Sequence, residues 1–488
     1  MKMNFAEMFK NEADKTCTEN GGLSYRSTNG GDLLDLYANL GGMRRRDESD
    51  IIQAWRAARR ENEELADNLI LYARNIRDGG LGERRIGRIL LKELAKVKPS
   101  KVKNNFQRIV DTGRWDDLFV FEGTSIESEM WLFVKNQFQK DIVDMKANKP
   151  ISLLGKWMPS INTSSAETKR LAQKFCKKFG VTPRTYRKTL SGMRKYIDVV
   201  EKKMSAGKWD EINFESVPSV AMSRYISTFN KRVSERFNEY KESLVKGEAK
   251  VNASTLYPYD IVKKYFRNFR SLDQIDESQW KALPNFVNED YEVVCLADVS
   301  GSMTVNNYEP ISTSIGLATY FAQRNKGAYH NMYLTFTTNP SFIKISDDWS
   351  LKRTLEEVRS RGIGYSTNLD AAMKAIFDVA VKTRDVPKAL VVISDMEINS
   401  WMGQNSGYCT SIANKWEKMY RQFGLESPKL ILWNVESRGD RVLAQSHEKV
   451  GFCSGYGIGP FKNLTELIEN SAYDSMVKIL SKPEFAWA

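Results

Sequence analysis

The feature that most constrains the fold is a change in hydrophobic period near residue 289. From residue 32 to about residue 240, apolar residues recur at helical spacing, as Leu65, Leu69 and Tyr72 do. After residue 289, short apolar runs alternate with amphipathic segments, which is the pattern of a mostly parallel sheet covered by helices. The chain is therefore predicted to be α + α/β, with an all-α N-terminal part and a doubly wound C-terminal part.

Short, turn-like breaks divide the helical part, which indicates paired helices stacked in a HEAT-like array. No fixed-period repeat is visible, so the array is inferred from the number of helices and the shortness of the loops. Whether it stays open or closes as a ring is left undecided. The expected ranges are a helical domain at 1–240, a connector with one or two helices at 241–288, and an α/β domain at 289–488.

The α/β part contains six candidate strands, and several are nearly continuous apolar stretches, as strands covered on both faces are. In such sheets, ligands bind at the carboxyl ends of the strands. The predicted strands are 292–297, 332–336, 342–345, 388–394, 429–433 and 450–453, and the predicted helices are 311–323, 351–359, 369–381, 412–423 and 464–480.

Charge is distributed unevenly between these parts. The chain carries +12 overall, with 52 Lys and Arg against 38 Asp and Glu in residues 1–288, a net of +14. Residues 289–488 contain 21 Lys and Arg against 23 Asp and Glu, a net charge of −2. A basic half beside a near-neutral half indicates a polyanionic partner, most plausibly nucleic acid, with a merely solvated basic surface as the alternative.

Residue usage also limits the function classes. Only His330 and His447 are available for imidazole chemistry, which disfavours an enzyme. Five widely spaced cysteines without a CxxC pair fit free thiols in a reducing compartment. Apolar stretches fall far short of the ~20 residues that span a bilayer, and residues 1–20 lack a secretory core. We therefore expect a cytoplasmic protein with no membrane partner.

Oxygen-bearing side chains gather on three loops of the α/β part. Asp298, Ser300 and Ser302 alternate just after the first strand, a second loop at 364–368 precedes a helix, and a third loop at 394–397 follows a strand. Hard cations such as Mg²⁺ or Mn²⁺ take oxygen ligands from several loops in this way. Taken alone, the first loop could instead cap the next helix.

Together the three loops resemble the metal-ion-dependent adhesion site of von Willebrand A domains, which combines a DxSxS loop, a threonine loop and an aspartate loop. The resemblance implies a sixth metal position open to a partner's carboxylate or to solvent. It further implies hydroxyl ligands from Ser300, Ser302 and Thr367, with Asp298 and Asp395 bound directly or through water.

The aspartate loop departs from the adhesion-type pattern at its next two positions. Met396 and Glu397 follow Asp395 where such domains commonly have glycine. The departure leaves the geometry toward a partner open. Glu397 is either an outer group of the site or a surface residue.

A glycine-rich segment in the basic half is flanked by arginines. The sequence RDGGLGERR runs from 77 to 85 between two predicted helices. Glycines let the backbone approach a phosphate or another backbone, and Arg77, Arg84 and Arg85 could bind phosphate. The alternative is a tight helix–helix turn with solvated arginines.

Two further segments interleave cations with aromatic residues, a mixture suited to single-stranded RNA. They are KWMPS at 156–160 and the stretch 185–196. Helical spacing assigns Trp157 and Tyr186 to the core. The candidate RNA contacts in these segments are Lys156, Arg187, Lys188, Arg194 and Lys195.

The helical and metal-site motifs together resemble the TROVE module of the Ro autoantigen joined to a von Willebrand A domain, and they are closer still to an uncharacterised TROVE-like family of phages, bacteria and plants. The resemblance implies a ribonucleoprotein component whose ring interior takes single-stranded RNA ends and whose outer face takes structured small RNA. Its motifs here are TENG at 18–21, RDGGLGER at 77–84, KWMPS at 156–160, YRK at 186–188, WDEINF at 209–214 and VPS at 217–219.

The leading hypothesis is thus a non-catalytic RNA-binding protein with a Mg²⁺ or Mn²⁺ site. The alternative is a metal-dependent protein–protein adhesion module in which the helices are only a scaffold. A metal-dependent nuclease is disfavoured, because a hydroxyl-rich single-cation site lacks the clustered carboxylates of two-metal phosphoryl chemistry.

Overall fold

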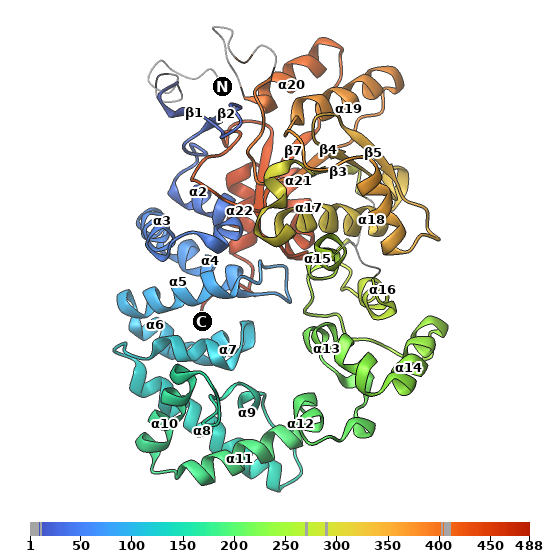
Figure 1. Cartoon of the computed structure of the whole chain (residues 1–488). Helices are drawn as coiled ribbons and strands as arrows, with labels where there is room; N and C mark the ends of the chain where they lie inside the picture. Colours follow the sequence, from blue (N-terminus) through green and yellow to red (C-terminus); the bar gives the residue numbers. More distant parts are fainter. Residues whose placement is uncertain (1–8, 10–11, 269–271, 288–290, 402–403, 405–410) are drawn as a thin grey trace. The chain divides into compact units, whose positions relative to one another are not determined.

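A computed structural model describes residues 9, 12–268, 272–287, 291–401, 404 and 411–488. The chain forms two compact units (Figure 1). We call Met1–Gly87 with Ala253–Ala486 the α/β unit, and Arg88–Asn252 with Trp487–Ala488 the helical unit. This grouping differs from the ranges expected from sequence, because the described residues up to Gly87 group with the sheet.

The α/β unit is built on a six-stranded sheet in the order β5-β4-β3-β6-β7-β8. All neighbours are parallel except β4 and β5, so an antiparallel strand closes one edge. The doubly wound topology and all six predicted strands are confirmed. The strands are β3 (Val293–Asp298), β4 (Met332–Phe336), β5 (Ser341–Lys344), β6 (Ala389–Ser394), β7 (Lys429–Asn434) and β8 (Val450–Ser454).

The strand order reverses between β3 and β6. From β3 the chain moves outward through β4 to β5, and it then returns to the other side of β3 to lay down β6. Ala297 pairs with Ile393, so the carboxyl ends of these two strands lie side by side. Such a switch point is where open α/β sheets bind ligands.

Helices cover the sheet, and α17 packs on β3, β4 and β6 while α21 packs on β7 and β8. The segment predicted as one helix at 464–480 is two helices, because the chain breaks at Asn470 and the Ser471 side chain caps the second. The helices are α15 (Pro258–Asn268), α16 (Gln274–Lys281), α17 (Val305–Arg324), α18 (Leu351–Ser360), α19 (Leu369–Thr383), α20 (Ile412–Gln422), α21 (Leu464–Glu469) and α22 (Ala472–Leu480).

The N-terminal segment of the α/β unit covers the β8 side of the sheet. Helix α2 contacts β7 and β8, and Asn434 donates a hydrogen bond to Asn39 at 3.1 Å. The apolar face of an amphipathic helix packs on a neighbouring element, and six of the eight α2 residues are buried. The segment comprises β1 (Lys15–Cys17), β2 (Leu23–Tyr25), α2 (Asp32–Asn39), the 3₁₀ turn η1 (Leu40–Arg45), α3 (Glu48–Glu61) and α4 (Glu63–Arg74).

The helical unit is a succession of helices that pack on their neighbours, in line with the predicted array. Its core is aromatic: Phe175 lies 5.4 Å from Tyr186 and 5.5 Å from Phe138 between ring centroids. Tyr186 is fully buried, which confirms its predicted core position. The helices are α5 (Arg84–Val97), which starts in the α/β unit, then α6 (Pro99–Asn104), α7 (Phe106–Thr112), α8 (Glu127–Lys146), α9 (Leu154–Trp157), α10 (Ala166–Phe179), α11 (Pro183–Tyr196), α12 (Val200–Ser205), α13 (Ser219–Arg232) and α14 (Ser234–Lys246).

The described residues contain no membrane-spanning helix and no paired cysteine. None of their helices combines the length and apolar character that crossing a bilayer requires. Four cysteines, Cys17, Cys176, Cys295 and Cys453, are free thiols, while Cys409 lies outside the described residues.

Candidate metal centre and basic surface

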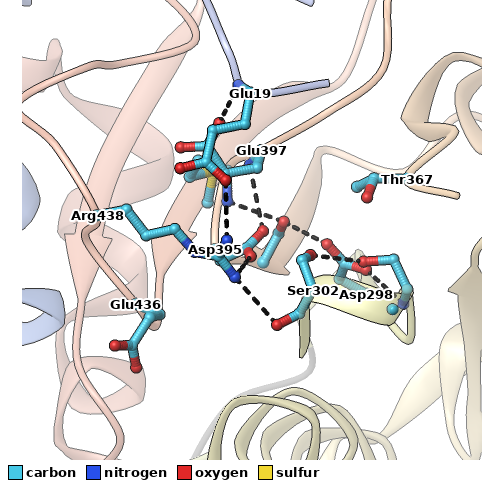
Figure 2. Close-up of polar contacts among 12 residues, drawn as sticks. Glu19, Asp298, Ser302, Thr367, Asp395, Glu397, Glu436 and Arg438 are labelled. Carbon is cyan, nitrogen blue, oxygen red and sulfur yellow. Dashed lines mark hydrogen bonds and ion pairs between the residues drawn. The ribbon is translucent and has the colours of Figure 1, made fainter. Parts of the chain in front are cut away.

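The three loops that the sequence singled out meet at the switch point of the sheet. The amide of Gly301 donates to the Tyr365 carbonyl at 2.7 Å, and the amide of Gly364 donates to the Val299 carbonyl at 2.8 Å. These two bonds join the first loop to the threonine loop. The Ser394 hydroxyl donates to Oδ2 of Asp298 at 2.5 Å and joins the first loop to the aspartate loop (Figure 2).

The predicted metal residues are shielded from solvent, and those of the first loop lie close together. Asp298, Ser300, Thr367 and Asp395 are buried, and Ser302 is half-buried. The hydroxyl oxygens of Ser300 and Ser302 lie 3.1 Å apart, and the Ser300 amide donates to Asp298 at 2.9 Å. The loop therefore holds its oxygen atoms close together through its own backbone.

Burial makes the ionised carboxylates of this cluster costly. Burial, with the nearby charge of Asp395, raises the pKa of Asp298 to about 7. Burial also raises the pKa of Asp395, although the positive charge of Arg438 acts in the opposite direction. The site thus holds more negative charge than its surroundings neutralise, which favours a cation.

The donor set suits a hard cation. The side chains offer only carboxylate and hydroxyl oxygens, the ligands that Mg²⁺ and Mn²⁺ prefer. The Oδ2 atom of Asp395 is buried and accepts no well-aligned hydrogen bond in the described part of the chain. Within that part, no three His, Cys, Asp or Glu side chains are arranged as a metal site. A cation here would therefore depend on the serine and threonine hydroxyls.

The two departures from the adhesion pattern have clear structural roles. Met396 has φ of 64°, the left-handed conformation that glycine adopts without strain, so its backbone follows the course that a glycine would take. Glu397 is 4% exposed and accepts hydrogen bonds from Arg441 at 2.8 Å and from the Glu19 amide at 2.6 Å. It is a buried neighbour of the site and not a surface residue.

Residues that sequence reasoning missed complete the cluster. Arg438, in the loop after β7, places Nη2 3.0 Å from Oδ2 of Asp395 and donates through Nη1 to Glu19 at 2.9 Å (Figure 2). Glu19 belongs to the turn between β1 and β2. The TENG motif at 18–21 was visible in the sequence, but nothing local linked it to a loop almost 400 residues away.

The glycine-rich segment 77–85 serves packing. A Cβ on Gly459 would lie 2.0 Å from the Gly80 carbonyl oxygen, and Asn463 donates to the Gly79 carbonyl at 3.1 Å. The absence of a Cβ on Gly459 thus lets its backbone meet that of residues 79 and 80 within the α/β unit. The exposed Arg77, Arg84 and Arg85 flank this contact, and Arg85 donates to the Arg46 carbonyl at 2.8 Å.

Helix α11 carries a stripe of cations on the face opposite its buried one. Arg187, Lys188 and Lys195 are exposed, and so is Arg184, which the sequence analysis did not select. A period of 3.6 residues places these four side chains on one face of the helix, away from Tyr186. Within the described residues, none of the four forms a hydrogen bond or ion pair. We call Arg184, Arg187, Lys188 and Lys195 the α11 stripe.

Two other predicted RNA contacts are engaged within the helical unit. The Arg194 guanidinium donates to the carbonyls of Gly155 and Met158, both at 2.9 Å, and to the Ser160 hydroxyl at 2.8 Å. It therefore holds the KWMPS loop in place. Lys156 is half-buried, with Nζ 5.4 Å from the Trp157 ring centroid. Trp157 is itself half-buried, so it is only partly a core residue.

The net positive charge of the chain lies entirely in the helical unit. Residues 88–252 contain 33 Lys and Arg against 19 Asp and Glu, a net charge of +14. The remaining residues are therefore at −2, since the whole chain carries +12. The sequence assigned the excess positive charge to the 288 residues of the N-terminal half, and the division into units confines it to 165 of them.

Comparisons with known proteins give the following likenesses. Two models of domains of unknown function match adjoining segments, DUF2828 at residues 131–291 and DUF7788 at residues 292–476. Uncharacterized protein L728 of Acanthamoeba polyphaga mimivirus is 26% identical over 520 residues, which cover 96% of this chain and 87% of that protein. The crystal structure of the Deinococcus radiodurans Ro (RSR) protein shares 14% identity over 92% of each chain, with a TM-score of 0.35.

Proposed function

We propose that this protein is a non-catalytic RNA-binding protein, a component of a small ribonucleoprotein, whose helical unit binds RNA phosphates. The observation that carries the proposal is the confinement of a net charge of +14 to residues 88–252. The motif resemblance to TROVE modules points to the same class of partner. The RNA would be single-stranded or a structured small RNA.

The α11 stripe is the best candidate for a phosphate track. Its side chains are exposed and have no partner within the described residues, so binding phosphate requires no existing ion pair to break. From Arg184 to Lys195 the helix rises about 17 Å, enough to follow several phosphates of an extended strand. Counterion release then makes the affinity fall with salt.

Replacing Arg187, Lys188 and Lys195 together with Glu should weaken RNA binding and flatten its salt dependence. Each lost contact with a single strand removes about 0.7 from the slope of log affinity against log salt, so three contacts remove about 2. The measurement is a filter-binding titration of a single-stranded and a structured RNA over a range of salt concentrations.

The matched control is Lys103, Lys177 and Lys246 replaced with Glu, three exposed lysines of the helical unit that lie outside α11. Both triple variants lower the net charge of +12 by the same six charges. A smaller loss in the control supports a local track on α11. Equal losses would contradict it, and the absence of RNA binding by the parent protein at low salt would contradict the proposed function.

We also propose that the three-loop site binds Mg²⁺ or Mn²⁺ through Asp298, Ser300, Ser302, Thr367 and Asp395. The cation would supply the positive charge that the buried carboxylates lack, and it would stabilise the junction of the three loops. It is not needed for phosphate contacts on α11, so RNA affinity should not depend on it.

Metal affinity should rise with pH up to about 7 and then level off. Burial raises the pKa of Asp298 to about 7, so below that pH the cation must displace a proton to bind. Each pH unit below 7 should therefore weaken binding by up to about tenfold. Calorimetric Mn²⁺ titrations between pH 5.5 and 8 measure the effect, and a constant affinity across that range would contradict it.

A further inference from the structure

We infer that the Arg438 guanidinium is the resident counter-cation of the three-loop site, and that a divalent cation binds by displacing it from Asp395. The inference rests on the metal site proposed above and adds a residue of this chain that competes for that site. It gives the site two states, one closed by arginine and one loaded with metal.

The position of Arg438 carries the argument. Its Nη2 atom donates to the Ser302 carbonyl at 3.1 Å and lies 3.0 Å from Oδ2 of Asp395 (Figure 2). It is therefore attached to the first loop and to the aspartate loop, the two loops that supply the carboxylates of the proposed metal site. Because Oδ2 of Asp395 is otherwise without a well-aligned hydrogen bond, the guanidinium is its main source of compensation.

The carboxylates and guanidinium groups of the cluster do not balance in charge. When all its carboxylates are ionised, the cluster has an excess of two negative charges, which one divalent cation would balance. Two guanidinium groups cannot do so alone. The carboxylates are Asp298, Asp395, Glu19 and Glu397, and the guanidinium groups are those of Arg438 and Arg441.

A displaced Arg438 would keep a partner. Its Nη1 atom donates to Oε2 of Glu19 at 2.9 Å, a bond that does not involve Asp395. The guanidinium can therefore leave Asp395 while it stays paired with Glu19. Displacement then requires a side-chain movement and no change in the sheet.

The turn that carries Glu19 is firmly attached to the aspartate loop. The Thr18 hydroxyl donates to the Ile398 carbonyl at 2.6 Å, and Asn20 donates to the Glu397 carbonyl at 2.5 Å. Glu19 thus stands beside the site as a fixed negative charge. Its carboxylate therefore stays in place to hold the displaced Arg438 guanidinium.

The test is calorimetric titration of the full chain with Mn²⁺, comparing the parent protein with Arg438→Met and Arg441→Met. Removing the competitor should tighten Mn²⁺ binding by at least about tenfold in Arg438→Met. Arg441→Met removes the same charge from the same cluster, but that guanidinium contacts Glu397 and the Cys17 carbonyl and not Asp395. Its affinity should change by less than about threefold.

Thermal melting gives a second measurement. Without metal, Arg438→Met should melt below the parent protein because Asp395 has lost its counter-ion, and Mn²⁺ should raise its melting temperature by more than it raises that of the parent. Unchanged or weaker Mn²⁺ binding in Arg438→Met, or an equal gain in Arg441→Met, would overturn the inference. If no protein of the series binds Mn²⁺, the metal site itself has failed, whereas RNA binding is measured separately and is unaffected.

Discussion

The double substitution Asp298→Ala with Ser300→Ala should abolish Mg²⁺ and Mn²⁺ binding. It removes one buried carboxylate, which accepts a hydrogen bond from the Ser300 amide, and one hydroxyl, which lies 3.1 Å from that of Ser302. The loss should exceed about 100-fold, because the remaining neutral hydroxyls and one carboxylate compete poorly with water for a strongly hydrated cation. Calorimetry with Mn²⁺ measures it directly.

The double variant should nevertheless fold. An ionised Asp298 is costly to bury, which offsets the hydrogen bonds that it accepts from Ser394 and the Ser300 amide. The control replaces the half-buried Asp378 and the exposed Ser360, both of the same unit, with Ala. Undiminished Mn²⁺ binding in a folded Asp298→Ala, Ser300→Ala protein would refute the metal assignment.

Gly459→Ala should destabilise the α/β unit by about 3 kcal/mol or more. The added methyl group would lie 2.0 Å from the Gly80 carbonyl oxygen, so one of the two backbones must move. Neither can move freely, since Asn463 binds the Gly79 carbonyl and the Leu81 amide donates to the Tyr72 carbonyl at 2.9 Å. Thermal melting should show a fall of roughly 6 °C or more.

Gly192→Ala is the matched control for this substitution. Gly192 lies inside α11, and the nearest atom to its added Cβ would be Cε of Met145 at 3.8 Å. Alanine favours a helix over glycine by about 1 kcal/mol, so the control should be neutral or slightly stabilising. If both alanine variants melt like the parent protein, the backbone contact between residues 80 and 459 is not as close as described.

The sheet could be predicted from the sequence because each strand carries its own signal. The runs 293–297 and 389–393 are apolar along their whole length, as strands buried on both faces are. The parallel topology then places the oxygen-bearing residues that follow these strands side by side. Asp298 and Asp395 end or follow the two strands that flank the switch point, so the sequence was sufficient to select both.

The attachment of the first 87 residues could not be found in the same way. Local periodicity identifies helices but not the surface on which they pack, so α2 was read as part of the helical array. Its polar residues Asp32, Asp35 and Asn39 fall at helical spacing on one face, so α2 has the pattern of any amphipathic helix. Nothing in that pattern distinguishes a sheet from another helix as the partner of its apolar face.

Charge counting located the basic region only coarsely. Residues 1–87 hold 14 Lys and Arg against 15 Asp and Glu, so they add nothing to the net charge of the N-terminal half. The sequence also could not separate Arg194 from Lys195, which are adjacent in α11 but point to different surroundings. The role of Arg438 could not be predicted from the sequence, because it depends on a contact with Glu19, which lies far away along the chain.

The split of the α/β unit around the helical unit sets an order in which the protein can fold during synthesis. Thr18 meets its hydrogen-bond partner Ile398 across 380 residues, and Asn39 meets Asn434 across 395. At 5–20 residues per second, the N-terminal segment waits roughly 20–80 s for the strands that bury it. Apart from Trp487–Ala488, the helical unit is continuous over residues 88–252, so most of its contacts can form first, while the apolar face of α2 emerges from the ribosome long before its sheet exists.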